Sequence, residues 1–134
     1  MQEHEQWIAI AQEDLAVAKI LLPKKLFTPI TYHCQQTAEK ALKGFLVSKN
    51  QEILKTHDLA KLLILCITFD QNFEKLYKAA KYLNPFSTKF RYPSEYDVPD
   101  VDEAQMAIKQ AQKIMHFVIK KIVASHTTKQ NSLF

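Results

Sequence analysis

Apolar residues recur at every third or fourth position along most of the chain, which is the spacing of amphipathic helices. The two clearest repeats predict a first helix over about residues 3–22 and a last helix that starts near Asp100, where Asp100 and Glu103 resemble a capping box. The first repeat consists of Ile8, Ala11, Leu15, Ala18 and Leu22. The last repeat consists of Ala104, Ile108, Ala111, Met115, Val118 and Ile122. Each of these helices is therefore expected to bury one continuous face.

Three more helices are predicted between these two. The second should start with Thr28 as its N-cap and Pro29 at its first helical position, and run to about Ser48. The third should cover about residues 57–67 after Thr56 as N-cap, and the fourth should follow Asp70. Asn84 and Pro85 break the fourth helix. The residues expected to face inward are Cys34, Ala38, Ala41 or Leu42, and Phe45 on the second helix, Leu59, Leu62, Leu63 and Cys66 on the third, and Phe73, Leu76, Tyr77, Ala80 and Leu83 on the fourth.

The fold class predicted from these elements is all-α, an antiparallel up-and-down bundle of four or five helices. The chain has one glycine in 134 residues, whereas sheets and hairpins depend on glycine turns. We expect a single helical domain over residues 1–124 and a polar, frayed tail over residues 125–134. Residues 84–100 lack periodicity and hold four aromatic residues, so this long loop should pack against the bundle.

Some apolar surface exceeds what one helical core needs. The second half of the first helix, residues 15–22, is apolar at seven of eight positions, and residues 114–119 of the last helix are almost as apolar. We expect this excess to form an isologous contact between two copies of the chain, which predicts a homodimer.

The composition points to the cytoplasm. Cys34 and Cys66 lie in apolar helical stretches rather than in a metal-ligand pattern, so both should be reduced and buried. The polar start of the chain does not resemble a signal peptide, and no apolar run is long enough to span a membrane. We expect no cofactor and no metal.

The positive net charge of the chain is compatible with an anionic partner. The net charge is +4 and the eighteen basic residues include a single arginine, Arg91. Proteins that read bases or clamp phosphates favour arginine. A nucleic-acid surface is therefore conceivable but not favoured.

Three polar groups could carry chemistry. Gln36, Lys40 and Lys43 share one surface of the second helix and could meet an anion, although a solvated face is the commoner reason for such spacing. His57 follows the predicted N-cap, where a hydrogen-bonding imidazole is a more frequent role than catalysis. The third group is the pair Arg91 and Tyr92, held before Pro93.

Two roles for Arg91 are open. It could form an ion pair with a carboxylate such as Asp14 or Glu39, which would be structural, or it could face a phosphate.

Four separated segments together resemble the HEPN domain, whose name abbreviates higher eukaryotes and prokaryotes nucleotide-binding. They are Trp7 with Asp14-Leu15, the run Gln35-Gln36-Thr37-Ala38-Glu39-Lys40-Ala41-Leu42-Lys43, the run Thr56-His57-Asp58-Leu59, and Arg91-Tyr92-Pro93, over about residues 3–123. The resemblance implies an antiparallel bundle that usually dimerises. It also implies a minimal nucleotidyltransferase as partner, in some systems as a toxin–antitoxin pair.

Many HEPN proteins are metal-independent ribonucleases with an arginine followed, after four to six residues, by a histidine. In this chain that histidine would have to replace Tyr96, Asp97 or Val98, and none is histidine. General acid–base cleavage of RNA then lacks its usual imidazole. The leading hypothesis is a non-catalytic HEPN module that binds a nucleotide or anion through Gln36, Lys40, Lys43, His57, Arg91 and Tyr92. The alternatives are a ribonuclease with an altered site and a purely structural dimer.

Overall fold

The computed structural model describes residues 2–90 and 98–132, with side chains described for residues 2–90 and 98–125. Five α-helices are present in these ranges: α1 (Glu3–Leu21), α2 (Phe27–Ser48), α3 (Leu59–Phe69), α4 (Tyr77–Leu83) and α5 (Val101–Ser132). Two 3-10 turns flank α4, η1 (Gln71–Leu76) before it and η2 (Asn84–Ser87) after it. These ranges hold no strand, which confirms the prediction of an all-α bundle.

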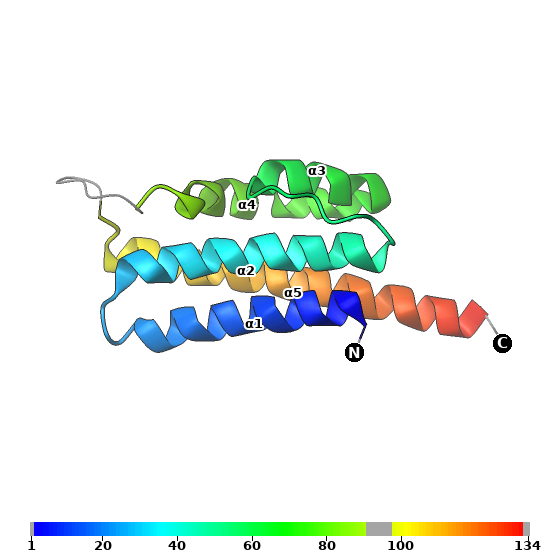
Figure 1. Ribbon diagram of the computed structural model, residues 1–134, viewed down its shortest axis with the longest axis horizontal. Coiled ribbons are helices and arrows are strands. Elements are labelled where there is room, and N and C mark those ends of the chain that lie inside the picture. The colour runs from blue at the N-terminus through cyan, green and yellow to red at the C-terminus, as the bar shows by residue number, and fades with distance from the viewer. Residues whose placement is uncertain (1, 91–97, 133–134) are drawn as a thin grey trace.

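The helices form an elongated bundle in which α2 and α5 are central (Figure 1). α1 packs on α2 and α5 at one edge, and the shorter helices α3 and α4 pack on α2 and α5 at the opposite edge. A segment over residues 49–58 runs back along α2 before α3 begins (Figure 1). α2 is therefore covered from several directions, while α3 has neighbours mainly on one side.

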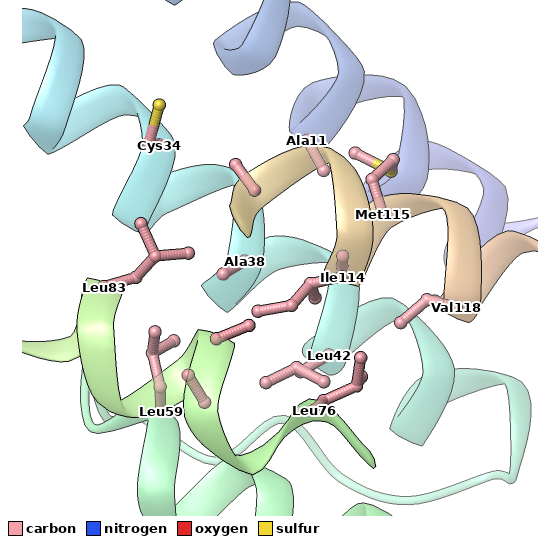
Figure 2. Close-up of a cluster of buried hydrophobic side chains, with 14 of the residues drawn as sticks. Ala11, Cys34, Ala38, Leu42, Leu59, Leu76, Leu83, Ile114, Met115 and Val118 are labelled. Atoms are coloured by element: carbon pink, nitrogen blue, oxygen red, sulfur yellow. The ribbon is translucent and has the colours of Figure 1, made fainter. Parts of the chain in front are cut away.

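The core contains side chains from every helix, as Figure 2 shows around Ala38, Leu59 and Ile114. The repeats predicted for α2, α3 and α5 are buried in full, and those of α1 are buried or half-buried. Phe73 of η1 joins the helices at the centre, with its ring centroid 4.4 Å from Phe45 and 4.9 Å from Phe117.

Gly44, the single glycine of the chain, lies inside α2 where α1 approaches it closely. A Cβ atom at this position would lie 3.1 Å from Ile8 Cδ1 and 3.2 Å from Trp7 Cβ. Glycine is an unfavourable residue inside a helix, and here its missing side chain makes room for α1.

Several predicted helix starts were wrong. α2 begins at Phe27 after Leu26, so neither the Thr28 cap nor the Pro29 start is present. The N-cap of α3 is Asp58, whose side chain accepts from the Ala60 amide, and not Thr56. Asp70 caps as predicted, but it begins the 3-10 turn η1 rather than a helix.

The start of α5 is as predicted, but one residue of α4 faces the other way. Asp100 accepts a hydrogen bond of 2.8 Å from the Glu103 amide, as the predicted start of α5 requires. Tyr77, expected to face inward, is 59% exposed, because α4 begins only at this residue and turns it outward.

Half of the dimer contact predicted for residues 114–119 is also wrong. Ile114, Met115 and Val118 are buried in the core of the same chain, so they cannot meet a second copy. Phe117 and Ile119 are half-buried, and their part in a contact stays a prediction. On α1 the exposed apolar residues are Ile10 and Ile20. The helical backbone of α5 continues to Ser132, and the fraying of residues 125–134 stays a prediction. None of the helices in the described ranges is long and apolar enough to cross a bilayer.

Candidate functional site

The middle of α2 carries polar side chains that are buried. Gln35 is fully buried, and Glu39, Lys43 and Gln36 are 4%, 7% and 8% exposed. For Gln36 and Lys43 the interpretation as a solvated face is therefore wrong. Burial of charged and amide groups is costly unless they find partners. In the described part of the chain, every buried side-chain nitrogen and oxygen atom has one.

Glu39 is the centre of one group of contacts. Its Oε2 accepts a hydrogen bond of 3.0 Å from Lys43 Nζ, and its Oε1 lies 2.8 Å from His57 Nδ1. Gln35 Nε2 donates to the His57 carbonyl at 2.9 Å, and Gln36 Nε2 donates to Gln35 Oε1 at 2.8 Å. α2 thus holds both the ring and the backbone of His57, which comes from the segment before α3.

Asp14 on α1 is the centre of a second group with the same composition. Its Oδ2 accepts a hydrogen bond of 2.7 Å from Lys40 Nζ, and its Oδ1 lies 2.8 Å from His33 Nδ1. Each carboxylate therefore lies between one lysine and one histidine. We refer to both groups together as the α2 network, which consists of Asp14, His33, Gln35, Gln36, Glu39, Lys40, Lys43 and His57.

The two histidines differ in how far they reach the surface. The side chain of His57 is 74% exposed and that of His33 is 29% exposed, whereas the carboxylates that bind them are 5% and 11% exposed. A neutral imidazole whose Nδ1–H donates to a carboxylate has Nε2 as an acceptor, and a protonated imidazole donates from both nitrogens. His57 can therefore exchange a proton or a hydrogen bond with a molecule at the surface.

The lysines of the α2 network are compensated. Lys40 is bound to Asp14 and Lys43 to Glu39, so the two ammonium groups and the two carboxylates sum to no net charge. Lys43 also lies 5.9 Å from the centre of the Trp7 ring.

Of the predicted site, the structure brings Gln36, Lys43 and His57 together around Glu39, and it joins Lys40 to Asp14 in the second group. Arg91 and Tyr92 lie outside the described residues, so their part in the site stays a prediction.

Two residues of this surface, His33 and Trp7, are not among the predicted site residues. His33 could have been found, because it continues the spacing of Gln36, Lys40 and Lys43 along one side of the helix. Trp7 gave a weaker signal, since its neighbourhood depends on how α1 lies against α2.

The start of α3 fixes the segment that carries His57. Asn84 accepts a hydrogen bond of 2.8 Å from the Leu59 amide and donates one of 3.0 Å to Asp58 Oδ1. The bond from Asn84 lowers the pKa of Asp58, and the backbone amides of Ala60 and Lys61 act in the same direction. The Asp58 cap is therefore ionised at neutral pH, where a carboxylate at a helix N-terminus is most favourable.

Both cysteines are buried free thiols, as predicted. Burial raises the pKa of Cys34 and of Cys66 to about 12, and at Cys34 the charge of Asp14 adds to the effect. Such thiols are unreactive at neutral pH. In the described ranges no three His, Cys, Asp or Glu side chains are grouped so that they could hold a metal ion.

Comparisons with known proteins agree with this fold. The HEPN domain family model matches residues 4–122. The crystal structure of TT1696 from Thermus thermophilus is similar, with 29% identity, a TM-score of 0.76, and coverage of 90% of this chain and 99% of that one. The crystal structure of ST0689, an archaeal HEPN homologue, is similar with 26% identity, a TM-score of 0.74, and coverage of 91% and 99%. No curated protein matches the chain. This chain belongs to the HEPN domain family.

Proposed function

We propose that this chain is a non-catalytic HEPN module that binds a nucleotide or another phosphate-bearing anion. In this proposal it acts in the cytoplasm as a homodimer, together with a minimal nucleotidyltransferase, in a setting such as a toxin–antitoxin pair. The family membership supports a nucleotide ligand, and the absence of histidine at Tyr96, Asp97 and Val98 argues against the usual ribonuclease chemistry.

The observation that carries the proposal is the way His57 is held. Glu39 fixes the Nδ1 side of the ring and Gln35 fixes the backbone, while most of the side chain is exposed. A core that served stability alone would gain little from burying this many charges, because the desolvation of ion pairs offsets their attraction. A preorganised imidazole at the surface is instead suited to a phosphate oxygen, with Gln36, Lys40 and Lys43 behind it.

Isothermal titration calorimetry with ATP and GTP tests this proposal. His57→Ala should weaken binding about tenfold, the usual effect of losing one charge-assisted hydrogen bond. His116→Ala is a matched control, because His116 is an exposed imidazole on α5 outside the network. If neither nucleotide binds, the nucleotide proposal is wrong.

The partners are tested separately. HEPN domains often dimerise, and exposed Ile10 and Ile20 on α1 are the apolar residues that support a contact between two copies here. Light scattering should report a dimer, and Ile20→Glu should shift it toward the monomer. Affinity purification after coexpression with a minimal nucleotidyltransferase encoded by a neighbouring gene tests that partner, and its absence from the purified complex would remove it from the proposal.

One observation favours a second function, a ribonuclease with an altered site. A carboxylate bound to one imidazole nitrogen orients the ring and sets its tautomer, as in acid–base catalysis, and Glu39 and His57 have this arrangement. Under this alternative, purified protein cleaves RNA, and either His57→Ala or Arg91→Ala reduces the rate by about 10²-fold or more. Equal background rates for wild type and both variants would leave the binding module as the better description.

A further inference from the structure

α3 leaves apolar side chains exposed at the edge of the bundle. Four of its eleven residues are buried, and Ile64 is 62% exposed although it lies in the middle of the helix. On the neighbouring helix α4, Tyr77 is 59% exposed. Contiguous apolar surface of this kind usually marks an interaction site.

The exposed residues flank a groove between α3 and α4. Ala60, Ile64 and Ile67 line one side at the spacing of a helix face, and Tyr77 and Ala80 line the other. The groove has a volume of about 270 Å³ and shares no residue with the α2 network. Parallel apolar walls formed by two helices are the geometry that receives an amphipathic helix in helix-in-groove recognition.

A basic hollow adjoins the groove and shares Lys81 and Pro85 with it. Lys78, Lys81 and Lys89 line this hollow, whose volume is about 490 Å³, beside a single carboxylate, Glu103. The ion pairs found among the described residues use Lys40, Lys43 and Lys121, and none uses the three lysines of the hollow. The apolar groove therefore ends at uncompensated positive charge.

We propose that the groove between α3 and α4, with its adjoining hollow, docks an amphipathic helical segment of a partner protein. The segment places apolar side chains between Ile64 and Tyr77 and acidic side chains against Lys78, Lys81 and Lys89. The apolar walls supply affinity, and the lysines set the direction of the segment and favour acidic partners over basic ones.

Charge argues for a different protein and against a second copy of this chain as the occupant. A symmetric contact would place this surface against itself, and the surface offers three lysines but, apart from Glu103, no carboxylate that could receive the lysines of a second copy. Like charges that meet across an interface are unfavourable. From Leu59 to Phe90 the chain carries five lysines and two acidic residues, and one of the latter, Asp70, is bound to Lys121.

The test uses two synthetic fluorescein-labelled helical peptides and the full-length protein. Both peptides carry leucines at helical i, i+3, i+4 and i+7 positions, and at one end the first has glutamates where the second has lysines. Fluorescence anisotropy measures binding, and hydrogen exchange locates it. We expect the glutamate peptide to bind about tenfold more tightly than the lysine peptide and to protect α3 and α4 from exchange.

Matched variants distinguish binding in the groove from nonspecific hydrophobic binding elsewhere on the surface. Ile64→Asp should weaken binding of the glutamate peptide about tenfold, whereas Val123→Asp should leave it unchanged, although Val123 on α5 is 58% exposed and Ile64 is 62% exposed. The double variant Lys78→Glu, Lys81→Glu should weaken it more than Lys109→Glu on α5. The proposal is overturned if the glutamate peptide does not bind, if both peptides bind equally, or if Val123→Asp acts like Ile64→Asp. It is also overturned if Ile64→Asp dissociates a dimer in light scattering, since a second copy would then occupy the groove.

Discussion

α2 and α3 differ in which residues they bury: α2 buries polar residues, and α3 leaves apolar residues exposed. α2 buries fourteen of its twenty-two residues, among them Gln35, Gln36, Glu39 and Lys43. α3 is almost entirely apolar, yet it buries only four of its eleven residues and exposes Ile64, Leu65 and Phe69. In this molecule burial follows the place of a helix in the bundle more closely than it follows residue type.

The reason is the number of neighbours that each helix has. α2 lies between α1, α5 and the segment over residues 49–58, so polar residues on nearly every side of it must find partners inside the protein. α3 lies at the edge, where apolar residues beyond those needed for the core stay at the surface. The central helix therefore carries preorganised polar groups, and the edge helix carries a surface suited to docking.

The largest expected effect on stability is at Glu39, in the buried polar part of α2. Glu39→Leu removes the partner of buried Lys43 and should lower the free energy of unfolding by about 3–5 kcal/mol, because an uncompensated charge then remains in the interior. Urea denaturation measures this change. Glu74→Leu is the control on an exposed site and should change stability by less than about 0.5 kcal/mol.

A double variant sharpens this test. Glu39→Leu combined with Lys43→Met removes both charges, so it should recover much of the lost stability while the His57 contact stays broken. If the double variant is as unstable as Glu39→Leu alone, the packing around the pair, and not its charge, determines the stability of α2.

Two neighbouring residues of α3 should separate the core from the docking surface. Leu62→Ala should cost about 2–5 kcal/mol, since Leu62 is fully buried, whereas Ile64→Ala should cost less than about 0.5 kcal/mol. Thermal and urea denaturation of both variants measures the difference. Equal losses would mean that α3 is covered on its outer side, which would contradict an open groove.

Much of the fold could be predicted, because the apolar spacing of a helix is local information. The inward residues of α3, such as Leu59 and Cys66, and the whole repeat of α5 are buried as predicted. The start of α2 could not be predicted, since Thr28 and Pro29 are typical of a helix start but the helix begins earlier, at Phe27. The burial of Ile114 and Met115 in the core of the same chain could not be predicted either, because only the packed structure shows how much apolar surface one core uses.

The polar contacts of α2 could be predicted only in part. The bond between Lys43 and Glu39 follows from their i, i+4 spacing on one helix. The bond between Lys40 and Asp14 depends on the packing of α1 against α2, and the bond between Glu39 and His57 depends on the course of the segment before α3. Spacing within one helix carries no information about these two contacts.

The smallest predicted effect concerns the attachment of the edge layer at the junction of α3 and η1. Asp70 accepts a hydrogen bond of 2.8 Å from Lys121 of α5, and this bond lowers the pKa of Asp70, with the Asn72 amide acting in the same direction.

This lowered pKa predicts how the stability depends on pH. A carboxyl group with a lowered pKa stabilises the fold at pH values above its ordinary pKa of about 3.9, and this contribution is lost as the pH falls through the lowered pKa. Since the pair is partly exposed, Asp70→Asn should cost about 0.5–1 kcal/mol at pH 7, and this difference from wild type should be lost as the pH falls through the lowered pKa of Asp70. Asparagine can still cap η1, so urea denaturation of this variant at pH 7 and in acid isolates the ion pair. If the difference persists in acid, the cap and not the charge joins α3 to the rest of the bundle.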